Sequence, residues 1–275
     1  MQKIGIDTGG TYYEESNMFH GSMKGIMGTK FDILIINQNR LKSQELWGDI
    51  VFELRRLDQL FNRFDTTSET SKINKEAALT PVQVNPEIWS VLKNCQMYHI
   101  RTLGLFDITL DNFSKVVLNE NNHTVSFSKK DISLDFGGYA KGYTLLKIKD
   151  IIHQAEVKDC FADFGNSSIL GIGHHPYGDA WKVNFENPYN HSIVLDEISL
   201  KDMALSVSGN TPSYTGHIVR PDAREPVNGR KAISVMTENP LEAEVLSTVF
   251  MIASEAEKKQ ISENFAIQRI VEYNL

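Results

Sequence analysis

The sequence has little of several features that would place it in a specialised class of protein. It has only two cysteines in 275 residues, Cys95 and Cys160, at no metal-binding spacing, so neither a disulfide scaffold nor a thiolate zinc site is expected. Each lies in an apolar pattern that favours a small buried side chain, and a single disulfide bond between the two is the alternative. No stretch approaches the ~20 apolar residues of a membrane-spanning helix. The first 19 residues also lack the apolar region of a signal peptide, so we expect a soluble chain without a transmembrane segment.

Charge of one sign is also not concentrated anywhere along the chain. The formal net charge is -7, and no run of five or more like charges occurs. A broad basic surface for nucleic-acid phosphates is therefore not expected, so DNA and RNA are disfavoured as partners. Hydrophobic residues make up 41% and charged residues 23%, the balance of an ordinary globular protein.

Apolar periodicity predicts a mixture of helices and strands. Helical patterns cover Ser43–Phe61, Pro86–Leu103, Lys141–Gln154 and Leu241–Ala253. Strand-like segments are Phe31–Ile36, His123–Phe127, Cys160–Phe164, Ile169–Ile172, Trp181–Phe185, Ala204–Val207, His217–Val219 and Ala232–Met236. Because helices and strands do not alternate regularly, we expect an α+β fold, a single domain with a largely antiparallel sheet flanked by helices.

The N-terminal segment carries a motif that suggests a different class. KIGIDTGGTYY, which begins at Lys3, resembles the phosphate-binding hairpin of sugar kinases and actin-like ATPases. Those folds need further phosphate and adenosine loops, and no later segment supplies them. We interpret the motif as a coincidence in a mobile segment over residues 1–22, with the domain at 23–275. An ATPase or kinase stays a minor alternative.

Two later segments could bind a phosphate and a metal ion. Paired glycines in LDFGGYAKGY, residues 134–143, precede a predicted helix, where backbone N–H groups and the helix dipole can face an anion such as a pyrophosphate. Lys141 adds a positive charge, although such glycines are equally often plain turn residues. Glu244 and Thr248 are four residues apart, so on a helix they share one face and offer oxygen ligands to Mg2+. The plainer interpretation is an exposed Glu beside a Thr.

Further short motifs occur in a specific order along the chain. They are MGT at 27–29, NRFD with SE at 62–69, FDIT at 106–109, LDFGGYAKGY at 134–143, SVSG at 206–209, GHIV with Pro221 at 216–221 and AEVLST at 243–248. Taken together, from about Met27 to the C-terminal helix, they resemble the flavin transferase family, FAD:protein FMN transferase or ApbE. Each piece is short, but the combination in this order is specific.

The resemblance implies a site and a reaction. It implies that FAD is lined by Met27, Phe64, Leu105, Phe106, Asp107, Asp135, Lys141 and Ile218, and that Mg2+ is bound by the Gly138 carbonyl, Glu244 and Thr248. The expected reaction is Mg2+-dependent transfer of the FMN half of FAD to a Thr or Ser hydroxyl of a target protein, with release of AMP. His217 is the candidate base, because histidine titrates near neutral pH; a structural, hydrogen-bonded histidine is the alternative.

Several positions depart from the family pattern. Glu244 stands where the family has Asp, Arg220 where HIxDP has Asp, Asn166–Ser168 replaces a GGD-like turn, and Leu110–Asn112 replaces VGP. These departures keep two other functions open: a protein that binds FAD without transferring FMN, and a Mg2+-dependent hydrolase that converts FAD to FMN and AMP. Family members often act in the periplasm or as lipid-anchored proteins. No lipid-accepting Cys follows an apolar start here, and the sequence assigns no compartment.

Overall fold

The computed structural model describes residues 6–212, 215–216, 218–221 and 225–275. Its largest element is an eight-stranded sheet in which every neighbouring pair is antiparallel, in the order β1-β2-β3-β7-β8-β11-β14-β15. The strands are β1 (Asp7–Tyr13), β2 (Met18–Ile26), β3 (Thr29–Ile36), β7 (Cys160–Phe164), β8 (Ser168–Ile172), β11 (Met203–Gly209), β14 (Lys231–Thr237) and β15 (Arg269–Asn274). This arrangement confirms the predicted α+β fold with a largely antiparallel sheet.

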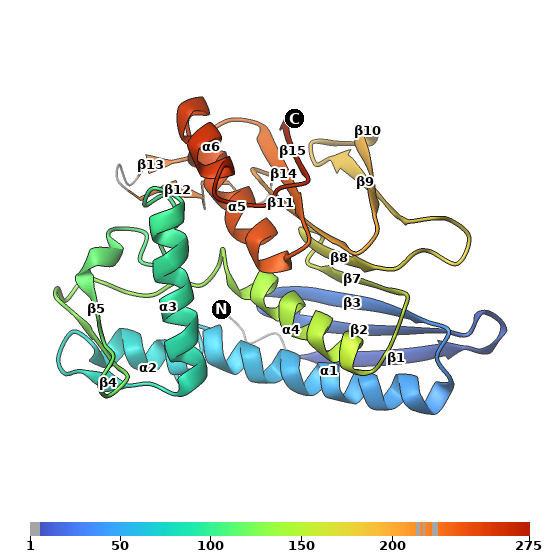
Figure 1. Ribbon diagram of the computed structural model, residues 1–275, viewed down its shortest axis with the longest axis horizontal. Coiled ribbons are helices and arrows are strands. Elements are labelled where there is room, and N and C mark those ends of the chain that lie inside the picture. Colours follow the sequence, from blue (N-terminus) through green and yellow to red (C-terminus); the bar gives the residue numbers. More distant parts are fainter. Residues whose placement is uncertain (1–5, 213–214, 217, 222–224) are drawn as a thin grey trace.

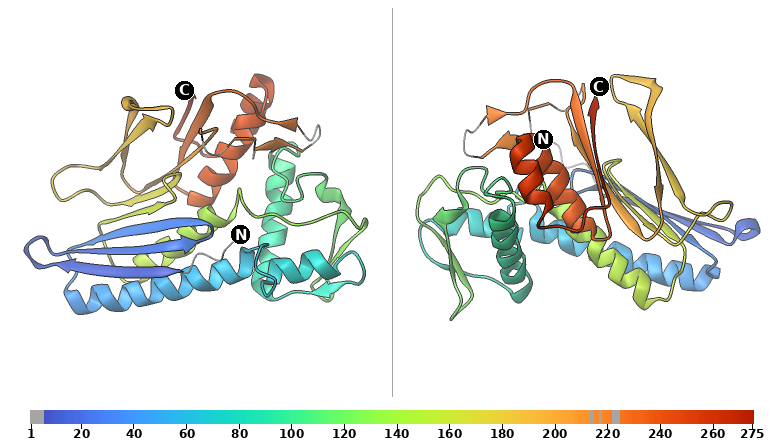
Figure 2. Two further views of the ribbon diagram at one scale, coloured as in Figure 1. Left: turned by 180° about the vertical axis from the view of Figure 1, so that it is seen from behind. Right: turned by 45° about the horizontal axis from the view of Figure 1, so that its top comes forward.

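Three helices cover one face of this sheet, as Figures 1 and 2 show: α1 (Arg40–Phe61), α4 (Ala140–Gln154) and α5 (Pro240–Ile252). Side chains alternate along β3, so that Phe31, Ile33 and Ile35 are buried beneath these helices. Cys160 and Cys95 are both buried free thiols, as their apolar surroundings predict. Smaller elements cover part of the opposite face of the sheet and form one end of the molecule.

The opposite face of the sheet is partly covered by a hairpin of β9 (Trp181–Asn187) and β10 (Asn190–Leu200). Trp181 and Leu200 pack there with Ile36 and Leu205. Beyond the sheet, a group of small elements stands at one end of the molecule (Figures 1 and 2). It comprises α2 (Glu69–Glu76), α3 (Pro86–Arg101) and a small sheet of β4 (Val82–Gln83), β6 (Thr124–Phe127) and β5 (Val116–Asn119). The described chain also contains the short strands β12 (Val219–Arg220) and β13 (Glu225–Pro226), the helix α6 (Glu255–Ser262) and the 3-10 helices η1 (Glu14–Ser16) and η2 (Phe113–Lys115).

The helix boundaries follow from capping residues. Asn39, Asn85 and Asn239 each accept a hydrogen bond from a backbone N–H in the first turn of α1, α3 and α5. Pro86 and Pro240 occupy the first helical position, where the missing N–H costs nothing. The four predicted helices are thus confirmed within a few residues. Two short helices, α2 and α6, were not predicted because eight residues show too little periodicity.

The described part of the N-terminal segment contains a β-hairpin. Strands β1 and β2 flank a short 3-10 helix (Glu14–Ser16) and pair from Asp7 with Lys24 to Tyr13 with Met18 at one edge of the large sheet. A side chain at Gly10 would begin 2.7 Å from the Phe19 ring and 3.2 Å from Trp47, and one at Gly21 would begin 2.7 Å from Trp47. Gly10 of the kinase-like motif and Gly21 of β2 therefore make room for the indole ring of Trp47 in α1, which is a packing role.

Among the described residues, no helix is both long enough and apolar enough to span a membrane.

Candidate active site

Two tight turns lie together at one end of the large sheet. Met27 and Gly28 join β2 to β3, and Gly165 and Asn166 join β7 to β8, all four with positive φ. A side chain at Gly165 would begin 2.8 Å from Thr29 Oγ1, so the turns are in contact. A methionine in the left-handed region is uncommon and strained. The MGT motif therefore marks a turn whose backbone shape is held by its surroundings.

Met27 is held by both helices that cross above this turn. Its N–H donates to Asp58 Oδ1 of α1 at 3.1 Å, and Thr144 Oγ1 of α4 lies 3.7 Å from its sulfur. Its side chain is half-buried and packs against two of the hydrophobic cores. The turn is thereby fixed to the start of α4, the helix that carries Lys141.

The segment before α4 is shaped by hydrogen bonds that leave the helix start open. Asp135 Oδ1 accepts from the N–H of Gly137 at 2.9 Å, and Asp135 Oδ2 lies 3.2 Å from the Arg63 guanidinium. Tyr139, the N-cap residue, supplies no side-chain hydrogen bond to the first turn. The dipole and the N–H groups of this turn are therefore suited to an anion.

The glycine before this helix touches the metal-binding candidate on α5. A side chain at Gly138 would begin 3.4 Å from Thr248 Oγ1, which makes these two residues neighbours. One turn further along α4, a side chain at Gly142 would begin 2.5 Å from Glu244 Cβ and 2.7 Å from the Pro240 carbonyl oxygen. Helices α4 and α5 thus cross at Gly142 in backbone contact, and this contact brings Gly138, Glu244 and Thr248 together.

Glu244 is a buried carboxylate with three side-chain partners. The residue is 3% exposed. Its Oε1 forms an ion pair with the ammonium of Lys141. Its Oε2 accepts from the hydroxyl of Ser168, in β8, and from Ser206 Oγ, in β11, at 3.1 Å. The plainer interpretation of Glu244 as an exposed residue is therefore wrong, because the side chain is enclosed between α4 and the sheet.

A chain of hydroxyls connects this carboxylate to Thr248. Ser206 Oγ lies 2.9 Å from Ser247 Oγ, which lies 2.8 Å from Ser208 Oγ, which lies 3.3 Å from Thr248 Oγ1. The four serines of this site were not predicted as individual site residues: Ser168, Ser206, Ser208 and Ser247. The period of two along a strand was the available signal, because it places Ser206 and Ser208 on one face of β11.

The predicted FAD residues do not all play the same part. Leu105 and Phe106 are buried in the core around α3, and Ile218 is 4% exposed in the same core. Phe64 is 80% exposed, with the Arg63 guanidinium 4.8 Å from its ring centre. Phe64 is connected to the site through Arg63, which forms the ion pair with Asp135.

Asp107 has an inward, loop-shaping role in this structure. Its carboxylate accepts from the N–H and the hydroxyl of Thr109, at 2.8 and 2.6 Å, and from the N–H of Phe113 at 2.8 Å. These bonds close the loop that follows α3. Burial leaves little of the carboxylate to face a ligand directly, so the contribution of this motif is the shape of its backbone.

His217 and Arg220 belong to the GHIV motif region that precedes α5 in the sequence. His217, the predicted base, lies outside the described residues. Arg220, which departs from the family pattern, donates to the Ile252 carbonyl at 2.8 Å and makes two bonds to Glu257, at 2.9 Å to Oε1 and 3.2 Å to Oε2. This bidentate pairing holds the pKa of Glu257 down at about 2. Arg220 therefore connects the β12 segment to α5 and α6.

The oxygen donors in the site suit magnesium by their chemistry. Within the described ranges, no group of three or more His, Cys, Asp or Glu side chains could hold a metal ion. The predicted ligands are the Glu244 carboxylate, the Thr248 hydroxyl and the backbone carbonyl of Gly138, which are hard oxygen donors. Mg2+ commonly binds one or two carboxylates and takes its other ligands from phosphates and water. The ammonium of Lys141 on Glu244 shows that the carboxylate accepts a cation here.

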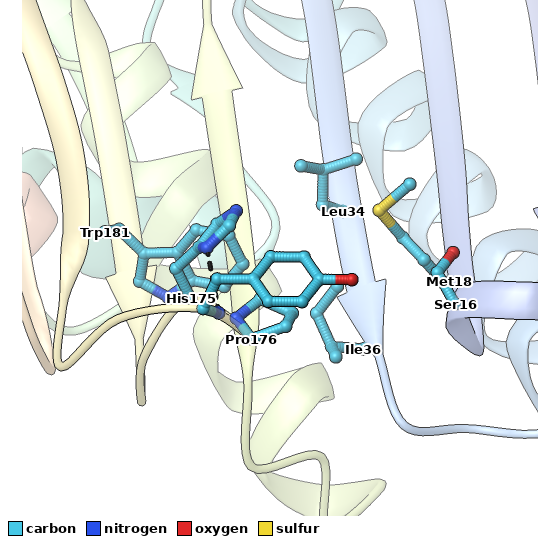
Figure 3. A pocket seen from close by; sticks show the side chains of 8 residues that line it. Ser16, Met18, Leu34, Ile36, His175, Pro176 and Trp181 are labelled. Atoms are coloured by element: carbon cyan, nitrogen blue, oxygen red, sulfur yellow. Dashed lines mark hydrogen bonds between the residues drawn. The ribbon is translucent and has the colours of Figure 1, made fainter.

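A separate cavity lies away from these residues. It has a volume of about 240 Å3 and is lined by Met18, Leu34, Ile36, His175 and Trp181, among others (Figure 3). Leu34, Ile36 and Trp181 belong to the core on the face opposite α4 and α5. None of the predicted site residues lines this cavity.

The geometry defines a class of protein: an α+β fold in which a glycine-rich helix start faces an acidic, hydroxyl-lined centre. The sequence profile of the ApbE family matches residues 27–117 and 110–271, so the chain belongs to the ApbE family. Among similar proteins is the FAD:protein FMN transferase of Chlamydia muridarum, 24% identical over 257 residues, which covers 79% of this chain and 77% of that protein.

Solved structures of the family share the fold. The flavin transferase ApbE from Vibrio cholerae superposes with a TM-score of 0.80 at 19% identity, covering 94% of this chain and 93% of its own. The ApbE protein from Thermotoga maritima gives a TM-score of 0.75 at 20% identity, covering 96% and 97%. At these identities the likeness supports the fold.

Proposed function

We propose that this protein transfers the FMN half of FAD to a Thr or Ser hydroxyl of a target protein in a Mg2+-dependent reaction that releases AMP. Membership of the ApbE family supports the reaction class. The observation that carries the proposal is the contact of Gly138 with Thr248, one helical turn from Glu244. This contact supports the proposal, because a helix start suited to an anion and oxygen donors suited to a cation are what a dinucleotide pyrophosphate with a metal ion requires.

Each group of residues has a distinct role in this proposal. The first turn of α4 and Lys141 bind the phosphates of FAD, and Met27, Phe64, Asp135 and Ile218 border the cofactor. Leu105, Phe106 and Asp107 shape the neighbouring loop. Glu244, Thr248 and the Gly138 carbonyl hold Mg2+. When bound, Mg2+ supplies positive charge that stabilises the phosphate oxygens during transfer.

The bond changes balance without a further reactant. The oxygen of the target hydroxyl attacks the phosphorus of the FMN phosphate, and the bond from that phosphorus to the AMP oxygen breaks. AMP leaves with the bonding electron pair, and the hydroxyl proton passes to a base, for which His217 is our candidate. The protein's part is to orient the phosphate and to keep the nucleophile in line with the leaving group.

The test uses the purified protein, FAD, Mg2+ and a flavin-accepting peptide. We expect the peptide to gain the mass of one FMN less one water, with one AMP released from FAD for each modified peptide, and we expect neither product in EDTA. A matched peptide with Ala in place of the target Thr is the control. AMP release without any peptide would instead establish the hydrolase, and FAD binding without AMP release would establish a binding protein. Unchanged transfer by His217→Ala would remove His217 from the mechanism.

A further inference from the structure

The ion pair of Lys141 and Glu244 occupies the centre that we assign to Mg2+. A buried carboxylate is costly unless a positive charge or several hydrogen bonds compensate it. The Glu244 side chain is 4% exposed and the Lys141 side chain 20%, so the pair is largely withdrawn from water. The ammonium of Lys141 is the cationic partner that the structure gives this carboxylate.

The two carboxylate oxygens face different parts of the molecule. Oε2 is occupied from the sheet, where it accepts from Ser168 and Ser206. Oε1 is paired with Lys141 of α4. A metal ion that uses Oε1 therefore meets the ammonium at the same oxygen. Two cations at one carboxylate oxygen repel strongly in a partly buried site, so each weakens the binding of the other.

We infer that Lys141 is the resident cation of this centre, and that Mg2+ and the Lys141 ammonium are alternative partners of Glu244. The inference rests on the proposed function, because the released ammonium is then free to pair with the pyrophosphate of FAD. Lys141 has one ammonium group, which cannot form a full ion pair with the carboxylate and with the pyrophosphate at the same time. Each ligand thus strengthens the binding of the other. When pyrophosphate pairs with Lys141, Glu244 is freed and binds Mg2+ more tightly, and bound Mg2+ increases the affinity for pyrophosphate by the same factor.

The decisive variant is Lys141→Met, studied with Mg2+ alone, without FAD or acceptor. Removing the competing ammonium is expected to tighten Mg2+ binding about tenfold, measured by isothermal titration calorimetry. In EDTA the same variant is expected to melt about 5 °C lower than the wild type, because its buried carboxylate has lost its cation. Saturating Mg2+ should restore the melting temperature.

Two controls separate competition from a general effect of charge. Lys149→Met removes a lysine from the same helix whose Nζ donates to the Glu238 carbonyl at 2.8 Å, and should change neither quantity. Lys141→Arg keeps a cation beside Glu244 and should keep the weak Mg2+ binding of the wild type. In a Glu244→Gln background, Lys141→Met should no longer tighten binding, because the shared carboxylate is gone.

The outcomes that overturn the inference are specific. Unchanged or weaker Mg2+ binding by Lys141→Met would show that the ammonium does not hold the metal position. Tighter binding with unchanged stability in EDTA would indicate a distant charge effect and would equally refute it. The absence of Mg2+ binding in both proteins would refute it as well. FMN transfer is not measured in these assays, so failure of the proposed function alone would leave their result intact.

Discussion

Replacing Gly142 by Ala should destabilise the protein, although the same change is usually favourable in a helix. The new Cβ would lie 2.5 Å from Glu244 Cβ, 2.7 Å from the Pro240 carbonyl oxygen and 3.0 Å from Leu241 Cα. Two of these neighbours are backbone atoms and the third is fixed to its own backbone, so none can swing away. Helix α5 would have to move by about an ångström relative to α4, since carbon contacts normally fall near 3.5–4.0 Å.

The expected size of the effect follows from two opposing contributions. Overpacking of this kind costs about 1–3 kcal/mol, and three unyielding neighbours favour the upper end. The greater helix propensity of Ala returns about 1 kcal/mol. We therefore expect Gly142→Ala to lower the free energy of unfolding by about 2 kcal/mol, or the melting temperature by roughly 4–8 °C. Because Glu244 and Thr248 move with α5, Mg2+ affinity should fall as well.

A matched glycine in α1 provides the control. A side chain at Gly48 would meet nothing within 4 Å, and the residue is exposed. Gly48→Ala should therefore stabilise the protein by up to about 1 kcal/mol. Urea denaturation of both variants gives the two free energies with one protocol. If Gly142→Ala were as stable as the wild type, or shifted in the same direction as Gly48→Ala, the close crossing of α4 and α5 would be refuted.

Three further predictions concern the metal, acid stability and the thiols. Thr248→Val keeps the side-chain volume but removes a ligand oxygen, so calorimetry should show Mg2+ affinity at least about tenfold lower; an unchanged affinity would exclude Thr248 as a ligand. The Arg220 guanidinium lowers the pKa of Glu257 from 4.5 to about 2, so this pair contributes stability above pH 4.5 and loses it as the pH falls toward 2. Arg220→Met should cost about 1 kcal/mol at pH 7 after allowance for solvent screening, and the difference in urea denaturation should shrink between pH 4.5 and 2 rather than persist. Burial raises the pKa of both Cys95 and Cys160, so a thiol reagent at pH 8 should label them slowly in the folded protein and quickly in denaturant; rapid labelling of the folded protein would contradict their burial.

Local pattern was sufficient for much of the fold and for the family. The helices α1, α3, α4 and α5 follow from apolar spacing, to which α1, α3 and α5 add Asn caps and α3 and α5 add first-turn prolines; all of these are properties of neighbouring residues. The order of short loop motifs identified the ApbE family, whose profile covers most of the chain. The location of Glu244 and Thr248 on one face of a helix was likewise predicted from their spacing of four residues.

Contacts between distant segments were decided only by the tertiary structure. The β1–β2 hairpin looked mobile because its polar and glycine-rich residues carry no strand signal, and its place depends on pairing with β3 and on room for Trp47. The same holds for the partners of Glu244: Lys141 is 103 residues away in the chain and Ser168 is 76. A sequence pattern reports a residue's neighbours along one helix or strand. The crossing of α4 and α5 over β8 and β11 depends instead on the packing of the whole sheet, and this packing turns Glu244 from a surface residue into a buried ion pair.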